Sequence, residues 1–203
     1  MNYGIGNVGS VVNMLRHVGI EVDLVATADE VERSKALVLP GVGAFGTAMR
    51  ALHECKLVDA LKQKVVAERT PILGICLGMQ LLAKESEEAP GCEGLGFVDA
   101  SFVKFSDHRT SERLKVPHMG WNTIDVKRPN PLVEQDEQER RFYFVHSYYA
   151  RCNNSEDVIA TCRYGEEFVC IYGRGNVWGT QFHPEKSHKF GMQLLSRFAA
   201  YAC

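Results

Sequence analysis

Hydrophobic residues in the first half of the chain follow helical spacing in some stretches and extended spacing in others. Five apolar residues recur at helical spacing across residues 8–18, and Gly19 ends that pattern. Residues 20–25 alternate between apolar and polar positions, which predicts a strand. Residues 36–39 and 71–73 are short apolar runs, which are typical of buried strands.

Helices are predicted between these strands. Thr27 and Glu30 have the spacing of a capping box for a short helix, and residues 47–55 and 57–68 are two further helical stretches. Strands that alternate with helices favour a mostly parallel sheet covered by helices on both faces. In such a sheet the functional site is expected at the carboxyl ends of the strands.

After about residue 90 the pattern changes to short strands separated by polar turns, which predicts a second half richer in β-structure. The charged stretches at 106–115 and 135–140 are predicted to be solvated loops. Ser187 can cap a final helix. No repeat or linker is apparent, so a single domain spanning residues 1–203 is expected. The predicted strands are residues 97–105, 123–127, 141–150, 158–163, 168–172 and 176–182, and the buried face of the last helix is marked by Phe190, Leu194, Leu195, Phe198 and Tyr201.

Composition narrows the classes of protein to which this chain can belong. A net charge of -2 and a pI of about 6.4 give no overall basic field, which argues against a nucleic-acid partner. No apolar run reaches about 18 residues and no signal-peptide pattern is present, so we expect a cytoplasmic protein that does not bind a membrane. The seven cysteines include no C-x-x-C pair, which favours reduced thiols over a disulfide framework or a zinc site.

One cysteine lies at a predicted corner between a strand and a helix. Cys76 follows the 71–73 strand and precedes a segment of helical spacing, residues 79–85, with Gly74 and Gly78 two positions away on either side. The spacing resembles the nucleophile elbow G-x-S-x-G, in which glycines permit a sharp turn. A thiol at a helix N-terminus is also favoured as the thiolate. The alternative is a buried structural cysteine, which is the commoner state of a single cysteine.

His183 and Glu185 supply the groups that this nucleophile needs. In an extended stretch, residues i and i+2 project from the same face, so the Glu185 carboxylate can reach the His183 ring. A carboxylate on one ring nitrogen fixes the tautomer and leaves the other nitrogen to accept a proton from the Cys76 thiol. The alternatives are an ordinary surface loop and a zinc site made by the same three residues, which lack the close spacing of zinc ligands.

A third stretch, residues 40–46, contains three glycines at the carboxyl end of the 36–39 strand. Glycines there would allow backbone N–H groups to approach a ligand closely, although an ordinary flexible turn has the same composition. With residues 74–80 and 181–187, this stretch resembles the motifs of the class I (triad) glutamine amidotransferases. Segments 117–122 and 143–148 resemble one branch of that family, the glutaminase subunits of imidazole glycerol phosphate synthase from histidine biosynthesis.

The resemblance covers nearly the whole chain, and it implies a flavodoxin-like α/β fold without a cofactor or a metal. It also implies that Cys76 attacks the side-chain amide of glutamine, that His183 gives a proton to the departing ammonia, and that Glu185 orients His183. The oxyanion hole would be formed by backbone N–H groups of Leu77 and of Val42 or Gly43, and one such donor is typically worth about 3 to 4 kcal/mol. The glutamine site would be formed by Gln80, Glu88, His146, Ser147 and Tyr148.

No part of the chain remains to bind an acceptor of ammonia, so the ammonia would pass to another chain. By resemblance, that partner is a (β/α)8-barrel cyclase subunit, which forms a heterodimer and receives ammonia through its interior. In the family the glycine-rich strand reorients to offer its N–H group, which links activity to the partner. The docking face would be formed by Asn7, Met119, Trp121, Tyr143 and Lys186, of which two are aromatic, as is typical of interface cores.

Two departures from the family pattern leave alternatives open. Members of the family begin with an apolar strand of about five residues before Asp-Tyr-Gly, whereas this chain starts at Met1-Asn2-Tyr3-Gly4, so we expect a start further upstream or a weakened sheet. Residues 114–119 and 186–192 also resemble a paralogous branch that supplies ammonia to amidine-forming synthases of surface-polysaccharide sugars. A free-standing γ-glutamyl hydrolase and a non-catalytic interaction module are the remaining alternatives.

Overall fold

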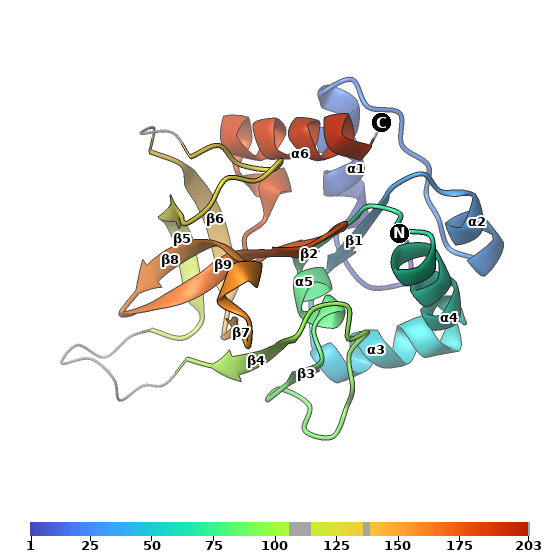
Figure 1. Ribbon diagram of the computed structural model, residues 1–203, viewed down its shortest axis with the longest axis horizontal. Coiled ribbons are helices and arrows are strands. Elements are labelled where there is room, and N and C mark those ends of the chain that lie inside the picture. Colours follow the sequence, from blue (N-terminus) through green and yellow to red (C-terminus); the bar gives the residue numbers. More distant parts are fainter. Residues whose placement is uncertain (106–114, 136–138, 203) are drawn as a thin grey trace.

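A computed structural model describes residues 1–105, 115–135 and 139–202, so most of the two charged stretches predicted as loops lies outside the described residues (Figure 1). The helices are α1 (Val8–His17), α2 (Ala28–Arg33), α3 (Phe45–Glu54), α4 (Leu57–Leu61), α5 (Leu77–Leu82) and α6 (His188–Ala202), with a π-helical turn at Lys62–Ala67 and 3-10 turns at Ser155–Asp157 and Pro184–Lys186. The strands are β1 (Leu37–Gly41), β2 (Ile72–Cys76), β3 (Glu85–Ser86), β4 (Ala100–Lys104), β5 (His118–Val126), β6 (Arg141–His146), β7 (Tyr148–Cys152), β8 (Val158–Tyr164), β9 (Glu166–Arg174) and β10 (Val177–Thr180).

The ten strands form one mixed sheet in which β2 lies between β1 and β10. The main path runs β1-β2-β10-β9-β7-β4-β3, while β8 pairs with β9 and β5, and β5 pairs with β6. The expected α/β fold with a β-rich second half is therefore confirmed. The sheet is not mostly parallel: of the described pairs, β1–β2, β2–β10 and β3–β4 are parallel and the others are antiparallel, so the expected parallel arrangement holds for both neighbours of β2 but not for most of the second half.

Helices cover both faces of the sheet around β2 (Figure 1). Ile72 packs in a cluster with residues of α3, α4 and α5, whereas Leu73 and Ile75 pack in a second cluster with residues of α1 and α6. Every residue of β2 is buried. Burial on both faces explains why this strand is a continuous apolar run rather than an alternating one.

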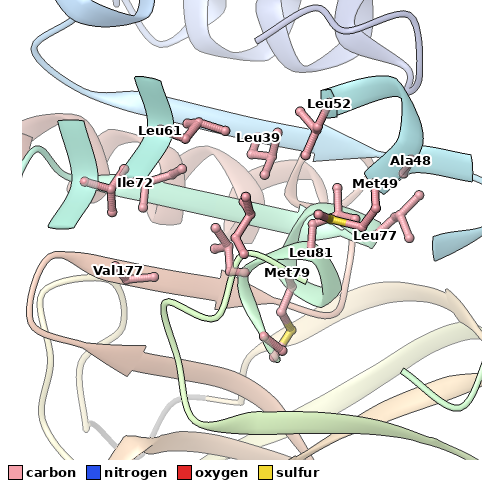
Figure 2. Close-up of a cluster of buried hydrophobic side chains, with 14 of the residues drawn as sticks. Leu39, Ala48, Met49, Leu52, Leu61, Ile72, Leu77, Met79, Leu81 and Val177 are labelled. Carbon is pink, nitrogen blue, oxygen red and sulfur yellow. The ribbon is translucent and has the colours of Figure 1, made fainter. Parts of the chain in front are cut away.

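The cluster on the α5 side holds the helix that follows Cys76. Figure 2 shows Leu39 of β1, Ile72 of β2 and Leu52 of α3 in the same cluster as Met79 of α5. These four side chains are fully buried. Burying a side chain of this size stabilises a fold by about 1.5 to 3 kcal/mol, so the cluster fixes α5 against the sheet.

Residues 20–25 do not form the strand that their alternation predicts, and this expectation was wrong. A groove of about 1060 Å³ lies between this segment and β1, and residues of α1, α2 and α6 also line it. The start of the chain bridges the gap, where the Asn2 N–H donates to the Val25 carbonyl (2.7 Å) and the Met1 nitrogen to the Val38 carbonyl (2.8 Å). A strand needs a neighbour about 4.8 Å away, and along most of this segment none is present.

Other sequence signals are confirmed with shifted boundaries. Thr27 and Glu30 form the capping box of α2. Strand β5 begins at His118, whereas the prediction began at residue 123, because the polar His118 side chain is buried against other rings instead of lying in a turn. Ser187 precedes α6 as expected, but its hydroxyl accepts from the Tyr143 N–H (3.0 Å) and donates to the His183 carbonyl (2.6 Å), so it ties the helix to β6.

Two further features concern membrane-spanning helices and the state of the cysteines. Within residues 1–105, 115–135 and 139–202, no helix combines the length and apolar character needed to cross a membrane. The cysteines that the structure describes are all free thiols, namely Cys55, Cys76, Cys92, Cys152, Cys162 and Cys170.

Candidate active site

Cys76 is the last residue of β2, and α5 begins at the next residue, Leu77. The backbone of Cys76 has φ 54° and ψ -108°, a region that residues with a side chain rarely occupy. Such strain persists only where the surrounding structure imposes it, and it is frequent at functional sites. The predicted corner is therefore present, and it holds a largely buried thiol at the start of a helix.

The glycines on either side of Cys76 are required by packing. A Cβ atom at Gly78 would lie 1.7 Å from the Leu39 carbonyl oxygen, and one at Gly74 would lie 2.7 Å from the backbone of Gly78. Both distances are far below van der Waals contact, so any side chain at either position would push α5 away from the sheet. The two glycines thus let α5 pack directly on β1 and β2 and set the position of the thiol.

His183 comes three residues after the end of β10, the strand that pairs with β2. Its Nδ1 atom lies 2.7 Å from the Glu185 Oε1 atom, and both side chains are only 2% exposed. The His183 N–H donates to the Tyr143 carbonyl (2.9 Å), which holds the backbone in place. Glu185 lies in a 3-10 turn, not in the extended stretch that we expected, yet the pairing with His183 is formed. The His183 Nε2 atom has no hydrogen-bond partner among the described residues.

The surroundings of His183 favour its protonated form. Burial lowers the pKa of the His183 ring. The Cys76 sulfur and the Glu185 carboxylate raise it by more than burial lowers it, so the resulting pKa is about 9. At neutral pH the ring is therefore an imidazolium. A proton held beside a nucleophilic sulfur is in position to be given to a leaving group.

Gln181 is a residue of this centre that sequence reasoning did not single out, although it opens one of the quoted motifs. It is fully buried, and its Nε2 atom lies 4.0 Å from the Cys76 sulfur, at the limit of a hydrogen bond to sulfur. Within the described ranges, Gln80 Oε1, Gln181 Oε1 and Glu185 Oε2 are buried without a hydrogen-bond partner. Buried polar atoms normally have a hydrogen-bond partner, so unpaired buried oxygens call for an explanation. A functional site, where such atoms take part in binding or catalysis, provides one.

The glycine-rich stretch lies beside the nucleophile, as its place after a strand predicts. Gly41 ends β1 in parallel register with Cys76, so Val42 and Gly43 follow directly next to the thiol. Gly43 has φ 109°, a conformation that favours glycine. The Tyr3 hydroxyl donates to the Pro40 carbonyl (2.8 Å), and this contact holds the end of β1 in place.

Glu88 lies at the helix that follows the glycine-rich stretch. Its carboxylate accepts from the Phe45 N–H (2.9 Å), at the start of α3, where Ala44 provides no side-chain cap. A carboxylate at a helix N-terminus satisfies a free N–H group and interacts favourably with the helix dipole. Glu88 therefore connects the expected glutamine site to the glycine-rich stretch. Gln80, another expected glutamine-binding residue, is buried in α5.

The turn between β6 and β7 contains the other residues expected to bind glutamine. The Cys76 sulfur lies 3.9 Å from the Val145 carbonyl oxygen, which places the end of β6 next to the nucleophile. Ser147 and Tyr148 are half-buried. Both ring nitrogens of His146 have partners within the protein, namely the Tyr148 carbonyl at 2.8 Å and a ring nitrogen of His118 at 3.0 Å.

Four of the five residues predicted for a docking face lie together. Met119 and Trp121 are 62% and 41% exposed on β5, and the Trp121 ring lies 6.1 Å from the Tyr143 ring. Lys186 has its amino group 5.8 Å from the centre of the Tyr143 ring. His188, which sequence reasoning missed, stacks on Trp121 at 5.4 Å and joins this face.

Asn7, the fifth predicted docking residue, accepts from the Ser10 N–H (3.4 Å) and caps α1. Helix α1 contacts the 3-10 turn Pro184–Lys186. Asn7 is exposed, so its side chain is accessible from solvent at the start of that helix. The described residues include no group of three His, Cys, Asp or Glu side chains that could hold a metal ion.

Comparison with known proteins assigns the fold and the family. The family model for "Glutamine amidotransferase class-I" matches residues 1–201. A protein of Methanococcus maripaludis, "Imidazole glycerol phosphate synthase subunit HisH 2", is 45% identical over 202 residues, which cover 100% of this chain and 98% of that protein. A protein of the same name from Pseudomonas aeruginosa is 45% identical over 199 residues, 98% of this chain and 96% of that protein.

Solved structures agree on the fold. "Crystal structure of glutamine amidotransferase" superposes with a TM-score of 0.75 at 22% identity, and it covers 98% of this chain and 95% of that one. "Structure of PurLQS from Thermotoga maritima" superposes with a TM-score of 0.73 at 19% identity, covering 98% and 94% of the two chains. With a match along nearly its whole length and a cysteine, histidine and glutamate in the geometry described above, this chain belongs to the class I glutamine amidotransferases.

Proposed function

We propose that this protein is the glutaminase subunit of an imidazole glycerol phosphate synthase, which hydrolyses glutamine to glutamate and ammonia for histidine biosynthesis. The observation that carries this proposal is the strained Cys76 corner beside the buried His183–Glu185 pair. The names of the relatives from M. maripaludis and P. aeruginosa support the same assignment. The biosynthetic role also supports a location in the cytoplasm.

In the proposed reaction the Cys76 thiolate attacks the amide carbon of glutamine, and the carbonyl oxygen becomes an oxyanion. Backbone N–H groups of Leu77 and of Val42 or Gly43 stabilise that oxyanion. The C–N bond breaks as His183 gives its proton to the nitrogen, and ammonia leaves a thioester on Cys76. Water, giving its proton back to His183, hydrolyses the thioester and releases glutamate.

The glutamine itself is proposed to bind between α5, Glu88 and the turn after β6. Gln80 and Glu88 offer side-chain oxygens, and Ser147 and Tyr148 offer groups of the turn that lies beside the nucleophile. His146 contributes by shaping that turn, because both of its ring nitrogens already have protein partners. Among these groups, Glu88 is the residue that can bind a ligand's positive charge such as the α-amino group of glutamine.

The ammonia acceptor is proposed to be a (β/α)8-barrel cyclase subunit that docks on Met119, Trp121, Tyr143, Lys186 and Asn7. The first two are large exposed apolar side chains, which are enriched in interface cores. Gly43 would allow the glycine-rich stretch to respond to docking, since a glycine at φ 109° can reorient its peptide group at little steric cost.

The proposal is tested by measuring glutamate release from glutamine by the purified chain, first alone and then with a barrel-type cyclase and its nucleotide ligand. We expect strong stimulation by the cyclase and no activity in Cys76→Ser. Equal activity with and without the cyclase would overturn the histidine-pathway assignment. It would favour a free-standing hydrolase of γ-glutamyl compounds or a subunit of another synthase.

A second acceptor enzyme has specific support. The relatives from M. maripaludis and P. aeruginosa are both numbered as second subunits of their kind, and residues 186–192 resemble a branch that serves amidine-forming synthases of surface polysaccharides. The same assay with such a synthase in place of the cyclase separates the two. Stimulation by that synthase alone would assign the chain to the polysaccharide branch.

A further inference from the structure

Two buried histidines, His118 of β5 and His146 of β6, face each other outside the Cys76 centre. They are cross-strand partners in the antiparallel pairing of these strands, and their ring nitrogens lie 3.0 Å apart. Their exposed fractions are 3% and 5%. Burial lowers the pKa of His118 to about 4 and that of His146 to about 3, so both rings are neutral at physiological pH. Each ring then carries one N–H donor and one acceptor.

The backbone decides which nitrogen carries the proton in each ring. A carbonyl oxygen only accepts, so His146 Nδ1, 2.8 Å from the Tyr148 carbonyl, must carry the hydrogen. His146 Nε2 is then an acceptor, and His118 Nδ1 donates to it. His118 Nε2 is in turn an acceptor, and it receives a hydrogen bond from the Asn122 Nδ2 atom at 3.3 Å.

The far end of this chain of hydrogen bonds is set independently. Asn122 Nδ2 also donates to the Arg163 carbonyl (2.9 Å), and Asn122 Oδ1 accepts from the Thr123 N–H (2.9 Å). These two backbone groups fix the orientation of the amide. The direction of donation imposed at Asn122 therefore agrees with the direction imposed at Tyr148. Every group in this chain of hydrogen bonds has a partner.

The chain of hydrogen bonds ends at the turn that is proposed to bind glutamine. Tyr148 follows Ser147, and the Val145 carbonyl on the other side of the turn contacts the Cys76 sulfur at 3.9 Å. The other end of this chain of hydrogen bonds lies on β5, where more buried and more exposed side chains alternate along the strand. His118 and Asn122 face the protein, and Met119 and Trp121 between them face solvent.

We propose that Asn122 and His118 are positioning residues for the glutamine site: through His146 they fix the Tyr148 carbonyl, and they connect the substrate turn to the strand that carries the exposed Met119 and Trp121. This inference rests on the proposed glutaminase function. It assigns these residues no contact with glutamine. Their effect on binding passes through the tautomer of His146.

The test exchanges one donor for an acceptor of the same shape. In Asn122→Asp the group facing His118 Nε2 becomes a carboxylate oxygen, which can only accept a hydrogen bond. His118 Nε2 must then carry the hydrogen, and the direction of donation along the chain of hydrogen bonds is reversed. The Tyr148 carbonyl then faces the lone pair of His146 Nδ1, or one of the two histidine rings becomes charged. We expect the KM for glutamine in the cyclase complex to rise about tenfold, with a smaller change in kcat, because a mispaired buried polar group destabilises the arrangement that binds the substrate.

Asn122→Ala provides the decisive comparison. It removes more contacts, but water can supply the missing donor at this half-buried position, so we expect its KM to change less than about threefold. A residue with only a packing role predicts the opposite order, since alanine differs more in shape than aspartate does. Asn13→Asp, at an exposed position of α1, is the matched control for the added charge and should retain the wild-type KM.

Two further measurements keep the inference open to refutation. Nitrogen-15 NMR of the histidine side chains in the free chain should show a protonated Nδ1 on both rings in the wild type and a protonated Nε2 on His118 in Asn122→Asp. Should that variant fail to fold, His118→Phe replaces it. It preserves the ring stack with Phe144 but offers no N–H to His146, and we expect the same rise in KM.

Unchanged KM in both Asn122→Asp and His118→Phe, a KM for Asn122→Ala as high as that for Asn122→Asp, or the opposite wild-type tautomers would each overturn the inference. Failure of the proposed function has a different signature. In that case the wild-type chain would not hydrolyse glutamine with the cyclase, whereas the NMR result does not depend on that activity.

Discussion

The state of His183 depends on two neighbours that act against its burial. Its folded-state pKa of about 9 lies above the value of about 6.5 for an unperturbed histidine. Because the folded pKa is raised, this group adds stability that is fully present below about pH 6.5 and is lost as the pH rises through about 9. The same proton is the one that the proposed reaction delivers to ammonia.

Glu185→Gln should lower the pKa of His183, since it removes the negative partner of Nδ1 at 2.7 Å. We expect the free energy of unfolding between pH 6 and 9.5 to depend less on pH in this variant, by on the order of 2 kcal/mol. Denaturant titrations across that range and NMR titration of the ring measure both effects. Glu54→Gln, at an exposed position of α3, is the control and should keep the wild-type pH dependence. If Glu185→Gln also kept the wild-type pH dependence, the assignment would be contradicted.

The glycines beside Cys76 give a second prediction for single residues. Gly78→Ala would place a Cβ atom 1.7 Å from the Leu39 carbonyl oxygen, so we expect a loss of stability of about 3 kcal/mol or more. Gly9→Ala, in α1 with no atom within 4 Å of the new Cβ, should be neutral or stabilising by up to about 1 kcal/mol. Chemical denaturation compares the two, and equal effects would show that contact with Leu39 does not explain the requirement for glycine.

Among the elements, β5 serves two sides of the molecule. Its outward side chains, Met119 and Trp121, are exposed, while His118 and Asn122 belong to the buried hydrogen-bonded chain that ends at Tyr148. A strand can do this because successive side chains point to opposite faces. Sequence reasoning began this strand at residue 123 and so missed the part that carries all four residues, since histidine, glycine and asparagine are uncommon in strands.

Trp121→Ala should weaken binding of the cyclase by about 2 kcal/mol or more, because large aromatic side chains near the centre of an interface dominate its energy. We expect the stimulation of glutaminase activity to fall with it, at a cyclase concentration near the wild-type Kd. Tyr201→Ala, an exposed aromatic on α6, is the matched control. Titration calorimetry measures both, and an unchanged Kd for Trp121→Ala would exclude this face as the docking site.

At the scale of the whole molecule, the groove beside β1 is a departure from a closed packing. It is lined by α1, α6, β1 and residues 18–25, and its volume is about 1060 Å³. The start of the chain lies along β1, because the Met1 nitrogen donates to the Val38 carbonyl and the Tyr3 hydroxyl donates to the Pro40 carbonyl. One extended apolar segment running into Met1 would pair with β1 and give residues 20–25 a neighbour.

Placing five apolar, β-branched residues directly before Met1 should therefore raise the melting temperature. Each buried side chain contributes about 1.5 to 3 kcal/mol before the entropy of ordering is subtracted, so the net gain should be several degrees. An extension of the same length made of glycine and serine is the control and should give no gain. If the two extended chains melted at the temperature of the 203-residue chain, the groove would not be a strand site.

Local spacing was enough to predict the corner at Cys76 and the pairing of His183 with Glu185. The pattern of glycines around Cys76 implies a strand-to-helix corner because packing excludes side chains there, and His183 and Glu185 pair because they are close neighbours in the chain. Residues 36–39 and 71–73 were recognisable as strands because both faces are buried and the run is continuously apolar. These features depend on a few consecutive residues, and the amino-acid sequence by itself determines them.

The tertiary structure decided what depends on distant partners. Residues 20–25 have the alternation of a strand, but a strand forms only beside a neighbour, and a groove lies there instead. His118 and Asn122 look like turn residues until β6 brings His146 opposite His118, and His188 joins the proposed docking face through its contact with Trp121. Hydrogen-bond partners separated by tens of residues leave no periodic signal in the chain, so only the folded arrangement reveals them.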